Sequence, residues 1–401
     1  MDNRQTKGFE ITQQKGVKEI KNDWLVKSQS NMGFYRVSDT FICDCSDSEL
    51  HKTTCKYAYA VRYYLDIEKH TLEGIKDEKI RLTYKQACKV YNEAQTQEGK
   101  LFDELLHDLV STIETHLQLG RERPRLLMRE EIFVTMKKIY SGMSSRRAVS
   151  LFEDAVDKGY ITHKPHFNTV SEFLNREDVT PILEELIKIT AAPLKVMEEN
   201  FAIDSTGFRT TSFSRYAEDK HGIVKERKWI KAHICCGTKM HVVTAAKITD
   251  EFGGDSPQFA SLTKETMEAR FKIKEVYADK AYSRRDNLAF VDRLGAVPYV
   301  PFRSSSGFRP FGAPIWKKMY YYFNMNQEEF IVHYNQRSNV ESTMAAIKRK
   351  LGETLKSKKK RAQINELLCK LIAYNITVLI HEMKELGIEP NLRGSDGQAL
   401  L

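Results

Sequence analysis

The pattern of apolar and polar positions divides the chain into a mainly helical region and a later region with β character. Between residues 86 and 200 apolar residues recur every three to four positions, which is typical of amphipathic helices. Helices are predicted at 129–140, 145–158 and 180–199, with a short one within 163–174. The first two are separated at Ser141-Gly142, and two short helices joined by a tight turn are compatible with a helix-turn-helix.

From Phe201 onward, short apolar runs bounded by turn residues predict strands. Strands are expected at the start of this region and at 228–236, 241–249, 275–279 and 296–302. Helices are expected at 256–271 and 284–294, an aromatic and basic loop at 303–325, and a closing amphipathic helix at 362–386. The order β-β-β-α-β-α-β-α is that of an RNase H-like fold, in which a mixed sheet is flanked by helices.

The N-terminal part is expected to form a small unit of its own. Residues 1–30 are polar and expected to be partly disordered. Strands are predicted at 34–37 and 40–43, a polar loop at 44–54, a helix at 55–65 and a charged linker at 66–85. The expected segments are therefore a small unit at 1–70, a helical region at 86–200, an α/β domain at 201–350, and a basic segment with a C-terminal helix at 351–401.

Composition adds a preference for partners. The 401 residues carry a net charge of +9 and a pI of about 9.0, which suits a polyanionic partner. No stretch approaches the roughly 20 apolar residues of a membrane span, and the start lacks an apolar signal segment. We therefore expect no membrane partner and a cytoplasmic location. The seven cysteines are odd in number and unevenly spread, so a disulfide framework is not expected.

Four chemically active side chains recur near the C-terminus. Tyr334, Arg337, Glu341 and Lys348 stand at offsets 0, 3, 7 and 14, so they would share one stripe of a helix. Such a stripe is usually apolar, whereas this one offers a carboxylate to a metal and two cations to phosphates. It resembles the Tyr-x2-Arg-x3-Glu-x6-Lys signature of insertion-sequence transposases of the DDE class, and the resemblance covers roughly residues 125–385.

The resemblance implies a three-carboxylate site. Asp204 in Phe201-Ala-Ile-Asp204 and Asp279 in Val276-Tyr-Ala-Asp279 each end a predicted buried strand, and Glu341 would be the third acid. It implies two Mg²⁺ or Mn²⁺ ions, with Asp204 bridging them and Asp279 and Glu341 each holding one, because hard cations prefer oxygen ligands. Other nearby acids are left out of the site: Asp250, Asp286 and Asp255, the last being expected to cap a helix.

The same resemblance assigns phosphate contacts. Arg337 and Lys348 would bind phosphates, and Tyr334 would stack on a base or bind a phosphate. The alternative is a set of helix-surface ion pairs with Glu341. The basic run 348–361, which includes Arg349 and Lys350, would follow a DNA backbone or remain a solvated segment. The aromatic and basic stretch at 316–322 would stack on DNA ends or pack in the core.

A cysteine pattern marks the N-terminal unit. Cys43-x-Cys45 followed by Cys55 resembles the SWIM zinc finger, whose pattern is Cys-x-Cys, a loop and Cys-x-His. Tyr57 occupies the place of the histidine, and tyrosine is a poor zinc ligand beside thiolates. His51 in the loop is the substitute for a Zn²⁺ site. The alternative is a decayed finger that keeps its fold through apolar packing.

The resemblance implies a prokaryotic, nucleoid-associated transposase. It would bind the terminal repeats of its element as double-stranded DNA, with the helical region recognising the ends, and cut and join them to target DNA as a homodimer in a synaptic complex. Two alternatives remain open from the sequence. One is an RNase H-like nuclease or resolvase without strand transfer, and the other is a transposase-derived DNA-binding protein that is no longer catalytic.

Overall fold

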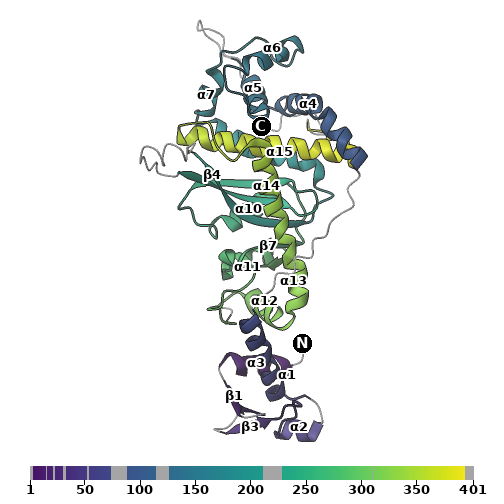
Figure 1. The fold of residues 1–401 in the computed structure, drawn as a ribbon, viewed down its shortest axis with the longest axis vertical. Coiled ribbons are helices and arrows are strands. Elements are labelled where there is room, and N and C mark those ends of the chain that lie inside the picture. Colours follow the sequence, from purple (N-terminus) through teal and green to yellow (C-terminus); the bar gives the residue numbers. More distant parts are fainter. Residues whose placement is uncertain are drawn as a thin grey trace, which may run out of the picture. The chain divides into compact units, whose positions relative to one another are not determined.

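The computed structural model describes residues 3–14, 16–20, 23–29, 33–51, 54–73, 88–113, 126–210, 228–309 and 311–392, without the side chains of residues 50, 51 and 66–73. The chain forms two compact units (Figure 1). The first comprises residues 1–83 with 324–327, and the second comprises residues 84–323 with 328–401.

The first unit contains a three-stranded antiparallel sheet in the order β1-β2-β3. Its strands are β1 (Val17–Ile20), β2 (Asp23–Lys27) and β3 (Phe34–Val37), and its helices are α1 (Asn3–Gln13), α2 (Ser46–His51) and α3 (Lys56–Glu73). Helix α1 packs tightly on α3, since a Cβ added at Gly8 would lie 2.6 Å from the Lys56 carbonyl oxygen.

In the part of residues 1–30 that the structure describes, Ile11, Val17 and Val26 join the same apolar core, and the expected partial disorder of this segment stays a prediction. Several other expectations for this unit are wrong. Residues 40–43 form no strand, and only Cys43 bridges to β3, because Phe41 has a φ of 61° that breaks extended structure. A helix, α2, lies in the expected loop at 44–54, and α3 continues through the start of the expected linker at 66–85. The rest of that linker, from residue 74, lies outside the described residues.

The second unit is built on a mixed five-stranded sheet in the order β6-β5-β4-β7-β8. Strands β4, β5 and β6 are antiparallel, whereas β7 is parallel to β4 and β8 to β7. The strands are β4 (Asn200–Arg209), β5 (Trp229–Gly237), β6 (Val243–Asp250), β7 (Glu275–Ala278) and β8 (Val297–Tyr299). Helices α10 (Gln258–Glu268) and α11 (Arg285–Arg293) connect them in the expected order, so the predicted mixed sheet flanked by helices is confirmed.

Alternation along β5 identifies the two faces of the sheet. Cys235 lies beside Thr266 of α10, whereas the Sγ of Cys236 lies 3.7 Å from the Oγ1 of Thr343 in α14 (Ser338–Leu351). Because successive strand residues point to opposite faces, α10 and α14 cover opposite faces of the sheet.

Helix α15 (Lys360–Glu385) is the centre of the helical part of this unit. It packs against α4, α5, α7 and α8 and against strand β6 (Figure 1). The packing helices are α4 (Cys88–Val110), α5 (Met128–Ser141), α7 (Thr169–Leu174) and α8 (Val179–Ala191), with α6 (Val149–Asp157) and the 3-10 turn η1 (Ala192–Leu194) beside them. Among the described helices, α15 alone has the length and apolar character of a membrane span, but 83% of its most apolar window is buried. It is therefore buried nearly all round rather than amphipathic as expected.

Two buried asparagines fasten α15 to its neighbours. Asn375 accepts a hydrogen bond from Val243 N (2.9 Å) and donates one to Val243 O (2.7 Å), which satisfies the edge of β6. Asn365 donates to Leu174 O (2.8 Å) and accepts from Thr180 Oγ1 (2.7 Å). Each amide satisfies backbone groups that no neighbouring strand or helix pairs.

Between β8 and α15 the structure contains more helix than the sequence predicted. The segment expected as a loop at 303–325 ends in helix α12 (Pro314–Met325), whose Trp316 and Tyr320 are buried, so these aromatics pack in the core. Helix α13 (Gln327–Tyr334) and the 3-10 turn η3 (Asn335–Arg337) precede α14. The predicted continuous stripe is therefore interrupted: Tyr334 ends α13, Arg337 ends η3, and Glu341 and Lys348 lie on α14.

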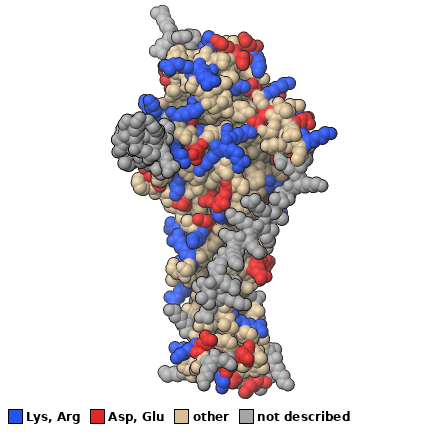
Figure 2. All heavy atoms as spheres, in the orientation of Figure 1, with Lys and Arg blue, Asp and Glu red and all other residues tan. Residues whose placement is uncertain are grey.

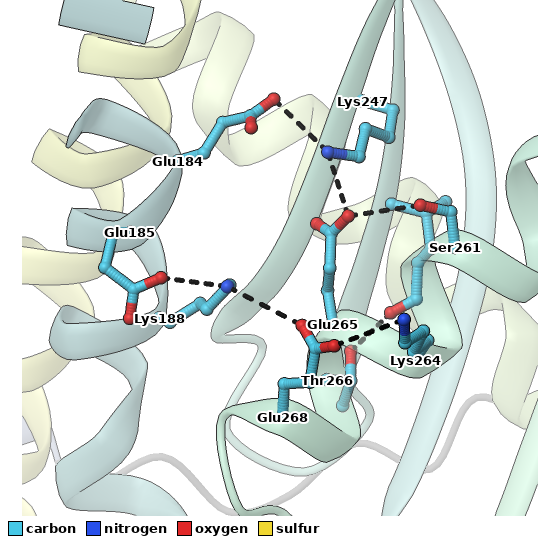
Figure 3. A network of polar contacts seen from close by, with 10 residues as sticks. Glu184, Glu185, Lys188, Lys247, Ser261, Lys264, Glu265, Thr266 and Glu268 are labelled. Carbon is cyan, nitrogen blue, oxygen red and sulfur yellow. Dashed lines mark hydrogen bonds and ion pairs between the residues drawn. The ribbon is translucent and has the colours of Figure 1, made fainter. Parts of the chain in front are cut away.

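A charged network joins α8, β6 and α10 on one face of the sheet (Figure 3). Lys247 of β6 lies 2.8 Å from Glu265 of α10 and 3.3 Å from Glu184 of α8. Lys188 of α8 lies 2.8 Å from Glu185 and 3.9 Å from Glu268. Each of these two lysines therefore links the two helices.

Candidate active site

Asp204 and Asp279 occupy equivalent places on neighbouring strands. Strands β4 and β7 run parallel, and their last register pair is Ile203 with Ala278, so each aspartate is the next residue of its strand. The residues just before the aspartates are fully buried, which fixes this part of both strands in the core. Asp279 follows the last residue of β7, whereas Asp204 lies inside β4, which continues to Arg209 along β5. The two acids therefore lie where the pairing of β4 with β7 ends. The Asp279 side chain also accepts a hydrogen bond from Ala281 N at 2.7 Å, where it caps the 3-10 turn η2 (Lys280–Tyr282).

Glu341 reaches the same place from α14 through an arginine. Arg337 donates one hydrogen bond to Asp204 Oδ2 (2.8 Å) and another to Glu341 Oε1 (2.6 Å). The i,i+4 spacing on the helix places the arginine and the glutamate side by side. One guanidinium therefore bridges an acid of the sheet and an acid of the helix that covers it.

The electrostatics of Asp204 show that the three acids influence one another. Burial raises the pKa of the Asp204 carboxyl, and the negative charges of Asp279 and Glu341 raise it further. The Ser205 N–H, 2.8 Å away, and the Arg337 guanidinium oppose this shift. The net direction of the pKa of Asp204 is upward, mainly because of burial, and the two neighbouring acids act in the same direction.

The donor set fits hard divalent cations. The three carboxylates come from separate elements, and the side chains of Asp204 and Glu341 retain 20% and 52% exposure. Among the described residues, the groups of three possible ligands whose atoms lie within 4.8 Å of one another do not include this triad. The ligand atoms of the three acids are therefore not close enough together in this arrangement for one ion held by all three. An ion between Asp204 and Glu341 would require Arg337 to move.

The other signature residues lie close by but differ in their contacts. The Nζ of Lys348 donates to Thr206 Oγ1 (2.6 Å) and lies 5.2 Å from the centre of the Phe208 ring. Tyr334 is half-buried, and the Arg337 guanidinium lies 5.7 Å from its ring centre. The alternative of an ion pair with Glu341 thus describes Arg337 and not Lys348.

The basic run after α14 is only partly available to a ligand. Arg349 is exposed and has no ion pair with any other described residue, whereas Lys350 lies 2.6 Å from Glu98 of α4. On the face drawn in Figure 2, Lys and Arg side chains are interspersed with Asp and Glu over the second unit. On this face the positive charge is therefore distributed among acidic side chains rather than gathered into one uniform surface.

Two residues beside the acids were not predicted. Tyr282 is buried, and burial together with the charges of Asp204, Asp255 and Asp279 raises the pKa of its hydroxyl. Asp255, which the sequence suggested as a helix cap, instead pairs through its side chain with Lys231 at 2.7 Å. In the sequence, only the position of Tyr282, three residues after Asp279, pointed to this tyrosine. No pattern in the sequence pointed to the pairing of Asp255.

The first unit gathers three of its cysteines. The Sγ atoms of Cys43, Cys45 and Cys55 are buried and lie within 4.8 Å of one another. The thiol of Cys43 donates to Cys55, which lowers the pKa of Cys55 to about 6 and raises that of Cys43. Tyr57 is buried and its ring packs 4.6 Å from that of Tyr35. The side chain of His51 lies outside the described residues. Three soft ligands of the kind that zinc prefers are thus close together.

Comparison with known proteins agrees with the geometry of the second unit. Residues 197–376 match the family model of the transposase DDE domain. This match supports a DDE transposase. The matched region begins just before β4 and extends into α15, so it includes Asp204, Asp279 and Glu341. The chain is also similar to a solved structure described as the cryo-EM structure of a piggyBac transposase synaptic complex with hairpin DNA. The TM-score is 0.37 and the identity 11%, over 73% of this chain and 76% of that chain.

Proposed function

We propose that this protein is an insertion-sequence transposase that cuts and joins DNA with Asp204, Asp279 and Glu341. The observation that carries the proposal is the arrangement of two aspartates that directly follow the last register pair of the parallel strands β4 and β7, with Arg337 tying the first to Glu341. This arrangement lies inside the region that matches the transposase DDE domain. The strand order β6-β5-β4-β7-β8 supports an RNase H-like core.

Two Mg²⁺ or Mn²⁺ ions are the proposed cofactors. Asp204 would be shared between them, with Asp279 and Glu341 each completing one set of ligands. When bound, such ions lower the pKa of the attacking water or hydroxyl and stabilise the leaving oxygen of the phosphodiester. The part of the chain's own residues is to hold the substrate: Arg337 and Lys348 would each contact a phosphate, and Tyr334 would border the same site.

The proposed substrate is double-stranded DNA, both the ends of the element and the target. The net charge of +9 supports a polyanionic partner. Helices α5 and α6, joined through Gly142 in the left-handed conformation, support recognition of DNA ends by the helical region. Because two ends must be brought together before joining, a homodimer in a synaptic complex is part of the proposal.

The test is strand cleavage on labelled DNA that carries the element's own ends, with Mg²⁺ or Mn²⁺. We compare the wild type with Asp204→Asn and with the control Asp286→Asn, whose side chain is 90% exposed on α11. The proposal expects metal-dependent 3′-hydroxyl ends from wild type and control and none from Asp204→Asn. Tight binding without cleavage by the wild type would overturn the catalytic assignment in favour of an inactive DNA-binding relative. Cleavage without joining of those ends to target DNA would favour a nuclease or resolvase.

A structural Zn²⁺ in the first unit is a separate part of the proposal. Cys43, Cys45 and Cys55 would supply three thiolates, and His51 the fourth ligand in place of Tyr57. Zinc content per chain, measured on purified protein, should fall in Cys45→Ser and stay unchanged in the control Cys88→Ser, because Cys88 is exposed on α4. Equal zinc content in both variants would contradict the site, and an unchanged content in His51→Ala would exclude His51 as a ligand.

A further inference from the structure

A small pocket in the second unit brings three lysines together. It lies where the C-terminal ends of α5 and α14 meet α15, and it is open to solvent. Lys138 comes from α5, Lys356 from the segment between α14 and α15, and Lys370 from α15. The remaining lining residues are Ile139, Gly142, Leu351 and Glu366.

Two of the lysines have partners that account for their positions. Lys370, which is 3% exposed, donates to Gly352 O (2.7 Å) and Thr354 O (3.1 Å), just after α14. Lys356 donates to Gly142 O at the end of α5. Lysines commonly bind the free carbonyls and the negative end of a helix in this way. A purely structural role therefore explains Lys356 and Lys370.

The carboxylate of the pocket is already saturated. Glu366 is 2% exposed, and its oxygens accept hydrogen bonds from Lys356 N at 2.9 and 3.1 Å and from Ser357 N at 2.8 Å. These backbone donors hold the carboxylate toward the segment between α14 and α15. No lysine of the pocket forms an ion pair with it within 4.0 Å among the described residues.

Lys138 is the exception in this arrangement. It is 6% exposed, it lines the pocket, and its ammonium has no hydrogen bond or ion pair with another described residue. Burial lowers the pKa of Lys138, and burial also lowers that of Lys370 to about 8. The charge of Glu366 raises the pKa of Lys138 without an ion pair, and the charge of Lys356 lowers it. Lys138 is therefore the lysine of the pocket whose ammonium stays available to an anion.

We propose that this pocket binds one phosphate group of DNA, with Lys138 as the buried cation that receives a phosphate oxygen. Lysine acts on phosphates as a point charge and needs no bidentate geometry. DNA is the proposed source because Leu351 and Lys356 of the lining belong to the basic run 348–361. Arg349, Lys358 and Lys359 of the same run are exposed. The choice of DNA rests on the proposed function, whereas the phosphate chemistry rests on the pocket alone.

The test uses Lys138→Met in the full chain, because methionine keeps the apolar stem and removes the charge. Two properties are measured: the rise in melting temperature caused by inorganic phosphate relative to chloride at equal ionic strength, and the salt dependence of DNA affinity. Loss of one phosphate contact should remove the thermal shift, weaken DNA binding about 5- to 10-fold and reduce the salt slope by about one. The control Lys188→Met removes a lysine of the network in Figure 3 and should leave both properties unchanged.

The outcomes separate this proposal from the proposed function. A wild-type DNA affinity and slope in Lys138→Met, together with a lost thermal shift, would overturn DNA as the source and leave free phosphate as the ligand. No change in either property would show that the pocket is structural and overturn the proposal, while leaving transposase activity untouched. A wild type that binds no DNA would overturn the proposed function and the choice of DNA together, and the thermal shift alone would then decide whether the pocket binds phosphate.

Discussion

Two clusters of acids lie on opposite faces of the same sheet, and they differ in how their charge is compensated. On the face covered by α10, four glutamates alternate with three lysines (Figure 3). On the face covered by α14, three acids have one arginine between them. The glutamates are Glu184, Glu185, Glu265 and Glu268, and the lysines are Lys188, Lys247 and Lys264.

This difference in charge compensation indicates which of the two clusters would bind a cation from solution. In the balanced network each lysine lies within 3.9 Å of at least one carboxylate, so the chain supplies its own counter-charges. In the other cluster the pKa of Asp204 is raised although Arg337 contacts it. In the second cluster one arginine faces two of the three acids, and the proposed metal ions would supply the remaining positive charge.

The largest expected effect is a loss of DNA cleavage, which we expect from a change in the cluster with Glu341 and not from a change in the balanced network. Glu341→Gln should reduce single-turnover DNA cleavage at least about 100-fold, or about 2.7 kcal/mol of transition-state stabilisation, because a metal ligand is lost. The matched change Glu268→Gln in the balanced network should leave the cleavage rate within about twofold. Similar losses in both variants would mean that Glu341 acts only through stability.

Much of this site could be predicted from the sequence because it depends on local patterns. The apolar runs before Asp204 and Asp279 specify buried strands. The expectation that each acid ends its strand is correct for Asp279, which follows β7, and wrong for Asp204, because pairing with β5 extends β4 to Arg209. The five strands of the sheet lie where the runs predicted them. The spacing from Arg337 to Glu341 left an ion pair as the alternative to a phosphate contact. The ion pair forms because these residues keep helical backbone across the end of η3.

Features that depend on tertiary packing could not be predicted. The aromatic stretch with Trp316 and Tyr320 was expected to be a loop, because its polar neighbours hide the helical period. In the structure it is a helix, stabilised by burial of these aromatic side chains in the core. The pocket around Lys138 joins residues from three separate elements, and no pattern along the chain connects them. The ion pair of Lys350 with Glu98 could not be predicted from the sequence for the same reason.

A buried acid outside both clusters sharpens the comparison through pH. Glu198 is 1% exposed and accepts a hydrogen bond from Lys239 N (2.7 Å) and one from Met240 N, yet burial raises the pKa of its carboxyl to about 7. A raised pKa therefore does not by itself mark a site. Between about 4.5, its ordinary value, and 7 the folded state binds more protons than the unfolded state, so this carboxyl's stabilising contribution is lost as pH rises through that window.

Glu198→Gln should therefore remove part of the pH dependence of stability. The wild type should lose up to about 3 kcal/mol of unfolding free energy relative to the variant between pH 4.5 and 8. Urea unfolding at several pH values measures the difference, with Glu268→Gln as the control that should follow the wild type. Parallel pH profiles for wild type and Glu198→Gln would contradict the assignment.

The balanced network should respond to loss of a lysine through stability alone. Lys247→Met leaves Glu184 and Glu265 facing each other without their shared cation, which should cost about 1–2 kcal/mol of unfolding free energy without changing cleavage. Lys264→Met is the control, because that lysine is 63% exposed and its pair with Glu268 should contribute under about 0.5 kcal/mol. A loss of cleavage in Lys247→Met at full folding would show that the network is not purely structural.

The smallest expected effect concerns the stability of the acidic cluster itself. Asp204→Asn loses an ion pair with Arg337 but also relieves the repulsion from Asp279 and Glu341, which together with burial raises the pKa of this carboxyl. The folded state thus favours the protonated form, and the stabilising contribution of that form is lost as pH rises above the ordinary aspartate range. The variant should unfold at neutral pH with a free energy equal to that of the wild type or higher by up to about 1 kcal/mol, and the gain should vanish under acid conditions. If Asp204→Asn instead destabilised the protein at neutral pH as much as Lys247→Met does, Asp204 would belong with the balanced network. The reason is that the charge of an acid that the fold needs for its stability is compensated by other side chains of the chain.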